Sequence, residues 1–289
     1  MGHSHLSRLA LRRRLSALAL AAGLAGLGAG ADARPLDAVK ASGTLRVTLY
    51  RDYKPYSFEQ DGKIAGIDEA VAEGVAKSMG LKLDAFLMHA DDNISDDLRN
   101  GVWKGTVLGQ APGDVMMHIP FDRRIEKDND RIALFAPYHV DGLALAVEPA
   151  KAAEAVDFSL FLKEKLAVDV GTIADMIAIS AFDQRVLPNV VHKRGIDVAV
   201  AAFETREVSG VYGEASGLEA YVRKGQRPYA LVYPKSRLSP DWPVGIAVKA
   251  DSKDLGAAVE AALKTMQDSG EMKTIFAAYG VDWRKPDAP

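Results

Sequence analysis

The sequence of 289 residues contains no cysteine. A protein without cysteine has no disulfide bonds, no thiol nucleophile and no thiolate metal site, so its stability must come from buried apolar side chains. An excess of positive charge is also missing, because 36 Lys and Arg stand against 39 Asp and Glu. Nucleic acid is therefore not an expected partner. The G-x-S-x-G elbow, the P-loop and a G-x-G-x-x-G turn after a strand are all absent, so we expect a protein that is not an enzyme.

The first 33 residues have the pattern of an export signal. Arg8 and residues 12–14 give a basic start, residues 15–30 form an apolar run, and Ala31-Asp32-Ala33 is an A-x-A cleavage site. This run is shorter than the roughly 20 residues of a membrane-spanning helix. We predict a signal peptide over residues 1–33 and a periplasmic protein, with a retained membrane anchor as the alternative. The export route, general secretory or twin-arginine, stays open.

Strand and helix patterns alternate along the rest of the chain. Residues 45–50 alternate in polarity, residues 67–79 place apolar side chains on one helical face, and residues 81–87 give a second strand pattern. Such a unit implies a parallel sheet with helices on its faces. Further strands are expected over 114–119, 166–170, 210–213 and 243–248, and helices over 173–182, 199–207 and 215–224, with two more at the C-terminal end. Residues 122–131 are expected to form a charged loop, and Pro137-Tyr138 to separate two extended runs within 132–147.

The order of these elements resembles the extracellular solute-binding proteins of family 3, which include periplasmic amino-acid-binding proteins. The resemblance rests on LRVTLYRDYKPYSF (Leu45–Phe58), FAPY (Phe135–Tyr138), AVDVGTIADM (Ala167–Met176) and GIAVK (Gly245–Lys249). It implies an α/β type II clamp of two lobes, each a mostly parallel sheet flanked by helices. Lobe 1 would hold residues 36–139 plus 244–289 and lobe 2 residues 143–240, with hinge crossings near 138–147 and 238–247.

The resemblance also implies a function and a set of binding residues. A small polar solute would bind between the lobes and be delivered to an inner-membrane ABC permease by a monomer that needs no cofactor. The implied ligand-binding residues are Arg123 or Arg124 for a ligand carboxylate, Gly171 and Thr172 for backbone N–H groups at a helix start, Glu214 for a ligand ammonium, and Tyr53, Tyr56 or Phe58 for stacking. Each also has a structural explanation: a surface basic pair, a tight turn, a helix-start acid, or packing. Arg124 lies further from Phe135 than in the family, and Glu214 stands where aspartate is usual.

The aspartates at positions 91, 92, 96 and 97 raise a second hypothesis. Calcium and lanthanide ions prefer several carboxylate oxygens, but the spacing is not that of a calcium loop, and a solvated loop with a helix cap is the alternative. The segments DDLRNGVWKG (Asp96–Gly105) and HIPFD (His118–Asp122) resemble the methylotrophic branch of the family, which accompanies quinoprotein methanol dehydrogenases or lanthanide-utilisation operons. The alternative functions are therefore an accessory protein of a periplasmic quinoprotein dehydrogenase, or a lanthanide or calcium uptake protein. Some proteins of this fold are dehydratases, which leaves an enzyme as a further alternative.

Overall fold

The computed structural model describes residues 33–234 and 241–287. The predicted signal peptide, apart from Ala33, lies outside the described residues, as do residues 235–240 and the last two residues. Within the described ranges, no helix combines the length and the apolar character needed to cross a membrane.

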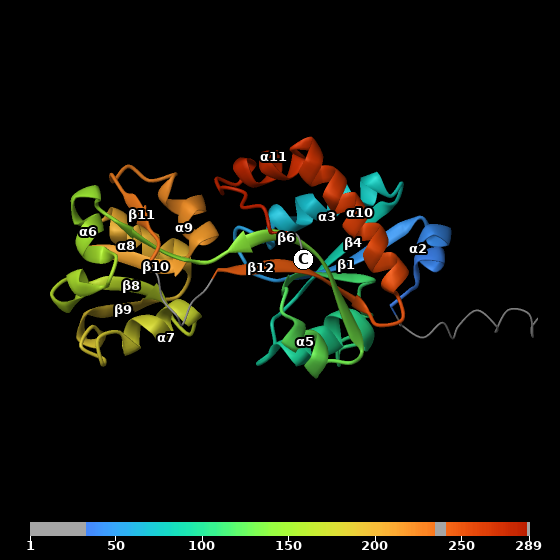
Figure 1. Cartoon of the computed structure of the whole chain (residues 1–289), viewed down its shortest axis with the longest axis horizontal. Helices are drawn as coiled ribbons and strands as arrows, with labels where there is room; N and C mark the ends of the chain where they lie inside the picture. Colours follow the sequence, from blue (N-terminus) through green and yellow to red (C-terminus); the bar gives the residue numbers. More distant parts are fainter. Residues whose placement is uncertain (1–32, 235–240, 288–289) are drawn as a thin grey trace, which may run out of the picture. The chain divides into compact units, whose positions relative to one another are not determined.

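The first sheet has five strands in the order β4-β1-β5-β12-β6 (Figure 1). Strand β1 runs parallel to β4 and β5, whereas β12 runs antiparallel to both β5 and β6. The strands are β1 (Thr44–Tyr50), β4 (Lys82–Met88), β5 (Val115–Pro120), β6 (Ile132–Asp141) and β12 (Trp242–Lys249). The other elements of this part are α2 (Leu36–Ser42), the hairpin β2 (Phe58–Gln60) and β3 (Lys63–Ala65), α3 (Ile67–Ser78), α4 (Ile94–Leu98), the π-helical turn η1 (Arg99–Trp103), α5 (Arg123–Asp128), α10 (Lys253–Ser269) and α11 (Glu271–Ala278).

The second sheet has five strands in the order β11-β7-β10-β8-β9. Strands β8, β9 and β10 run parallel, and β7 is antiparallel to β10 and β11. The strands are β7 (Leu143–Val147), β8 (Leu166–Asp169), β9 (Val190–Lys193), β10 (Gly210–Glu214) and β11 (Ala230–Val232). The helices are α6 (Ala152–Ala155), α7 (Ile173–Ser180), α8 (Ile196–Glu204) and α9 (Ala215–Val222), with short 3-10 turns η2 (Pro149–Lys151), η3 (Ser159–Leu162) and η4 (Leu187–Asn189).

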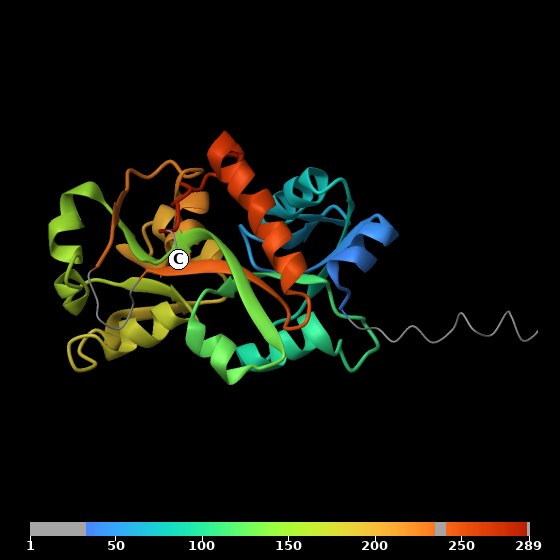
Figure 2. The same cartoon turned by 45° about the vertical axis from the view of Figure 1, so that its right-hand side comes forward.

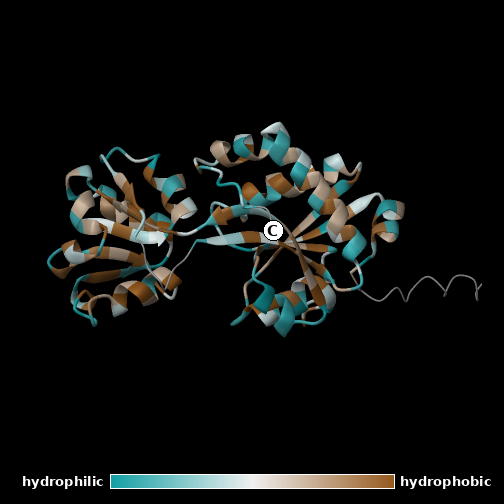
Figure 3. Ribbon diagram, in the orientation of Figure 1, coloured by the Kyte–Doolittle hydropathy of each residue, from teal (hydrophilic) through white to brown (hydrophobic). Residues whose placement is uncertain are grey.

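Apolar side chains between the sheets and their helices form the cores. In the first sheet, Val71 and Val75 of α3 and Leu263 of α10 pack with Val47 of β1. Phe161 and Phe203 are buried in separate clusters of the second sheet. Figure 3 shows the same division, with hydrophobic strands beneath helices whose outer faces are more hydrophilic. Burial of this apolar surface takes the place of the disulfides that the sequence cannot form.

The predicted fold class is confirmed, and two local expectations are wrong. The predicted charged loop at 122–131 contains helix α5, because the Asp122 side chain caps it by accepting the Arg124 N–H. Pro137-Tyr138 does not separate two strands, since β6 runs through it and pairs with β12 across an irregular register. The bulge places Ala136 at φ 50°. Both sheets contain parallel and antiparallel strands. The parallel strands are joined by helices. The antiparallel strands lie where the chain leaves the first sheet and where it re-enters it.

Asp141, the last residue of β6, joins several distant segments. Its carboxylate is 1% exposed and accepts hydrogen bonds from the Tyr56 hydroxyl at 2.6 Å and the Gly142 N–H at 2.8 Å. It also accepts the Ser216 N–H at 3.3 Å and pairs with Arg284 at 3.3 Å. Figures 1 and 2 show β6 (green) and β12 (orange) side by side as two strands of the first sheet. The lobe boundaries predicted from the sequence stay a proposal. We propose that the chain crosses between the lobes once near Gly142 and once near Trp242.

A second buried carboxylate, Asp114, anchors the segment before α2. Its side chain is fully buried and accepts the Arg34 backbone N–H at 3.2 Å, the Arg34 guanidinium at 2.7 Å and the Arg46 N–H at 2.8 Å.

We expect Asp114→Ala to lower the free energy of unfolding by about 3 kcal/mol, because the substitution leaves a partly buried arginine and two backbone N–H groups without their acceptor. Asp84→Ala is the matched control, since Asp84 is exposed and pairs with Arg46 only at 3.8 Å. Urea unfolding of both variants gives the comparison. Equal losses in the two would show that the Asp114 contacts contribute little.

Candidate functional site

The parallel strands of the second sheet bring acidic side chains to one edge. Strands β8 and β10 end at Asp169 and Glu214, and β9 leads into Gly195 and Asp197. Because the three strands are parallel, these ends lie together, and each is followed by a helix start. Ligands in open α/β sheets bind at such carboxyl ends. The topology thus predicts a site at this edge.

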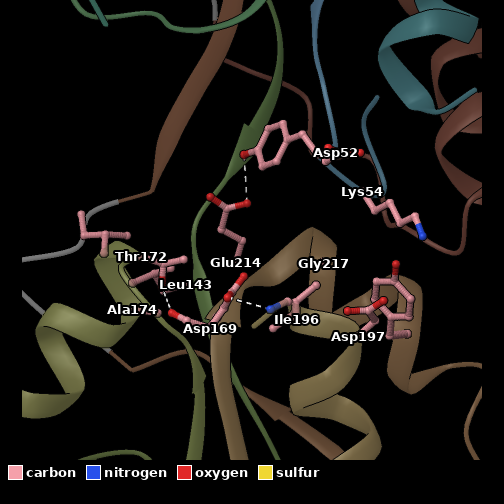
Figure 4. Close-up of a pocket in the computed structure, with 15 residues that line it drawn as sticks. Asp52, Lys54, Leu143, Asp169, Thr172, Ala174, Ile196, Asp197, Glu214 and Gly217 are labelled. Atoms are coloured by element: carbon pink, nitrogen blue, oxygen red, sulfur yellow. Dashed lines mark hydrogen bonds between the residues drawn. The ribbon is translucent and has the colours of Figure 1, made fainter. Parts of the chain in front are cut away.

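A pocket of about 360 Å³ lies there (Figure 4). Asp169, Asp197 and Glu214 line it from the second sheet, and Asp52 and Lys54 from the loop after β1. Burial and the neighbouring charge of Asp197 raise the pKa of Asp169. Among the described residues that line the pocket, four carboxyl groups thus stand against one lysine, which favours a cation.

Glu214 is tied to the opposite wall by Tyr53. The Tyr53 hydroxyl donates to Glu214 Oε2 at 2.9 Å, a contact drawn in Figure 4. Burial, and then the charge of Asp141, raise the pKa of Glu214 to about 7. The carboxyl group is therefore partly protonated near neutral pH, and it gains full charge when a cation binds beside it.

A second pocket of about 490 Å³ adjoins the first and shares Asp52, Tyr53, Ile173 and Glu214 with it. It adds mainly aromatic and apolar walls, from Tyr50, Ile94, Pro120, Trp242 and Val244, together with Arg51, Ala90, Asp97 and His118. The combined space has an acidic end and an aromatic end, with Glu214 between them.

His118 is the unusual member of this second wall. It is 6% exposed and sits at φ 61°, a conformation that L-residues rarely adopt. Its Nδ1 lies 3.1 Å from Asp68 Oδ2, and the Tyr138 hydroxyl donates to Asp68 Oδ1 at 2.6 Å. Its Nε2 is buried with no hydrogen-bond partner among the described residues. Burial works to lower the pKa of His118, but the charge and hydrogen bond of Asp68 outweigh it, so the pKa is raised.

The structure brings some of the predicted binding residues to the pockets. Tyr53, Thr172 and Glu214 line the first, and Gly171 is adjacent to Thr172. Tyr56 is fully buried behind them, with its ring 4.0 Å from that of His118. Phe58 begins β2 and lies beneath the Lys54 ammonium instead of lining a pocket.

Arg123 and Arg124 do not line either pocket. Both belong to α5, where Arg123 pairs with Glu126 at 2.7 Å and Arg124 with Asp122 at 2.5 Å. Arg123 lines a different surface groove together with Phe121. The resemblance predicted that one of these arginines would bind the ligand carboxylate, but neither side chain lines the two pockets.

The acidic loop is held by its own hydrogen bonds. Asp97 accepts from the Tyr50 hydroxyl at 2.9 Å and from the Asp91 N–H at 2.6 Å. Asp96 pairs with Arg99, Asp91 accepts from Asn100, and Asp92 is exposed. Within residues 33–234 and 241–287, no three or more His, Asp or Glu side chains are grouped closely enough to hold a metal ion.

The two pockets are also lined by residues that the sequence reasoning did not select as ligand contacts, namely Asp52, Lys54, Asp169, Asp197 and His118. Asp169 ends a predicted strand, so the rule that ligands bind at carboxyl ends of parallel strands could have identified it. For His118 no local signal exists, because its partners Asp68 and Tyr138 are distant in sequence.

The comparisons with known proteins bear on the fold. No family model matches the sequence. The structure is similar to an ancestral cationic amino acid solute-binding protein, AncCDT-1, with a TM-score of 0.68 and 22% identity over 85% of this chain and 99% of that one. It is similar to an amino acid ABC transporter substrate-binding protein of Streptococcus pneumoniae bound to L-arginine, with a TM-score of 0.60 and 18% identity over 86% and 98% of the two chains. This chain has the two-lobed fold of solute-binding proteins.

Two more proteins are similar to this chain. The unliganded, open L-cystine solute receptor of Neisseria gonorrhoeae has a TM-score of 0.64 and 16% identity over 87% of this chain and 98% of its own. Cyclohexadienyl dehydratase of Pseudomonas aeruginosa is 41% identical over 73 residues, which is 25% of this chain and 27% of the dehydratase. These relatives lend no support to the methylotrophic branch or to a quinoprotein partner.

The raised pKa of Glu214 has a consequence for stability. The folded protein holds this proton up to about pH 7, whereas the unfolded chain releases it near 4.5, so stability falls as pH rises between those values. We expect the free energy of unfolding of the wild type to fall by about 3 kcal/mol over this range. Glu214→Gln should not show this fall, and it should be more stable than the wild type at pH 8. Urea unfolding from pH 4 to 8 measures the difference between the two proteins, and superimposable pH profiles would contradict the assignment.

Proposed function

We propose that this protein is a periplasmic solute-binding protein that captures a small cationic solute, of the basic amino acid class, and delivers it to an inner-membrane ABC permease. The proposal rests on the acidic pocket, where Asp52, Asp169, Asp197 and Glu214 face one lysine. A cation in this pocket relieves the repulsion among the carboxylates. The similar structures include a cationic amino acid solute-binding protein and a substrate-binding protein bound to L-arginine, and these ligands support the same class.

Closure of the lobes around the ligand would report occupancy to the permease. The Tyr53–Glu214 hydrogen bond links the loop after β1 to the end of β10, so ligand binding at Glu214 acts on a contact between the two halves. The signal-peptide pattern supports the periplasmic location. The quinoprotein-accessory and metal-uptake alternatives remain predictions that no contact among the described residues favours.

A second candidate function is acid catalysis by Glu214. A buried carboxyl group with a pKa of about 7 can donate a proton at neutral pH, and the 73-residue match to cyclohexadienyl dehydratase makes dehydration the reaction to test. Release of water from a hydroxycyclohexadiene produces an aromatic ring, which absorbs in the near ultraviolet. Turnover by the wild type that is lost in Glu214→Gln would favour this candidate over passive binding.

The proposed binding function predicts a ligand-dependent melting temperature. We expect L-arginine and L-lysine to raise it by a few degrees, since a ligand at a hundred times its Kd adds about 2.7 kcal/mol of stability, and L-glutamate to leave it unchanged. The protein is first refolded to remove any ligand that co-purifies. A shift with L-glutamate and none with the basic amino acids would contradict a cation site.

Calorimetry on variants locates the site. We expect Glu214→Ala to weaken L-arginine binding by about 2–5 kcal/mol, because the ligand cation loses its most buried partner. Asp122→Ala is the matched control, as Asp122 is an acidic residue on the surface near α5 and lines neither pocket. Equal affinity of the two variants would remove Glu214 from the site.

A further inference from the structure

The acidic pocket leaves the carboxylate of an amino acid without an evident partner. Among residues 33–234 and 241–287, no arginine lines the first pocket, and Arg51, which lines the second, pairs with Glu59 at 3.3 Å. Lys54 is exposed, and its ammonium lies over the Phe58 ring. A zwitterionic ligand therefore needs another donor within reach of Glu214.

His118 has the properties of that donor. It lines the second pocket beside Glu214 and Tyr53, and its Nε2 is a buried polar atom with no partner among the described residues. Such an atom costs free energy in the absence of a ligand, and a positive φ away from glycine is tolerated where surrounding contacts impose it. Asp68, itself held by the Tyr138 hydroxyl, accepts from Nδ1 and fixes the ring orientation. Burial works to lower the pKa of His118 but the charge of Asp68 raises it, and in the protonated ring Nε2 carries a second N–H that can donate to a ligand.

We infer that His118 binds the ligand's carboxylate through Nε2, in place of an arginine, with Asp68 and Tyr138 as positioning residues. The inference rests on the proposed function and adds the residue that distinguishes an amino acid from a plain amine. Tyr53 connects the two ends of the site, since its ring packs edge-on against His118 at 4.8 Å between centroids and its hydroxyl bonds Glu214.

The choice of ligand separates the two roles. L-arginine and agmatine share the guanidinium group, but agmatine lacks the carboxylate. We expect the wild type to bind L-arginine at least about tenfold more tightly than agmatine, the range of a charge-assisted hydrogen bond. In His118→Asn this preference falls to about one, because the asparagine amide takes the place of Nδ1 toward Asp68 and nothing takes the place of Nε2. Asparagine also tolerates the positive φ.

His89→Asn is the matched control, because His89 is exposed and lines neither pocket. It should keep the wild-type preference. Arg51→Gln and Lys54→Gln test the competing cations, and loss of the preference in either of these variants, with His118→Asn unchanged, would overturn the inference. Equal binding of L-arginine and agmatine by the wild type would also overturn it while leaving the cation site intact. Binding of neither ligand by the wild type would reject the proposed function itself.

A measurement on the wild type covers the case in which His118→Asn does not fold. Imidazole nitrogen spectra of the ¹⁵N-histidine-labelled protein should change for one buried histidine on addition of L-arginine, with the Nε2 signal moving toward that of a hydrogen-bonded donor. Agmatine should leave that nitrogen unchanged. Identical spectra with the two ligands would contradict a carboxylate contact at His118.

Discussion

The buried carboxylate of Asp141 holds together the parts on which the site depends. It stands where β6 ends and the chain leaves the first sheet, and it accepts hydrogen bonds from the Tyr56 loop and the start of α9 while pairing with Arg284. A buried charge with so many partners fixes the positions of the segments that supply them. The same charge acts on function, since it contributes to the raised pKa of Glu214. The Asp141 side chain thus holds the segments that meet at the end of β6, and it also affects the protonation of Glu214.

The two sheets contribute different chemistry to the cleft. The second sheet places Asp169 and Glu214 at the ends of parallel strands, where helix starts follow directly. The first sheet supplies His118, oriented by Asp68 and Tyr138, and the aromatic Tyr53. Negative groups thus lie on one side and a histidine with a raised pKa on the other, an arrangement that supports our proposal of a ligand that carries both charges. Neither sheet holds such a site by itself.

The positions of Arg123 and Arg124 show that a local contact can place a side chain elsewhere than a family resemblance predicts. Arg123 and Arg124 follow β5 closely, as a carboxylate-binding arginine would, but the Asp122 side chain caps a helix at this point. Once α5 forms, both guanidinium groups pair with acids of the same segment, Glu126 and Asp122. The helix also explains the greater spacing to Phe135 that the sequence shows. Neither arginine lines the two pockets, whereas His118 does, and its Nε2 has no hydrogen-bond partner in the described part of the chain.

The sequence alone determined the alternation of strands and helices, because period and capping act over a few neighbouring residues; α3, β8 and α10 needed nothing more. It also selected Tyr53, Thr172 and Glu214, which occur in segments with a recognisable order and which line the first pocket, and their role as ligand contacts stays a prediction. Three features were decided only by the tertiary structure: the mixed direction of the sheets, the exclusion of Arg123 and Arg124, and the grouping of His118 with Asp68 and Tyr138. Pairing between residues 50 or more positions apart leaves no periodic trace in the chain, since burial and hydrogen-bond geometry select the partners only when the sheets assemble.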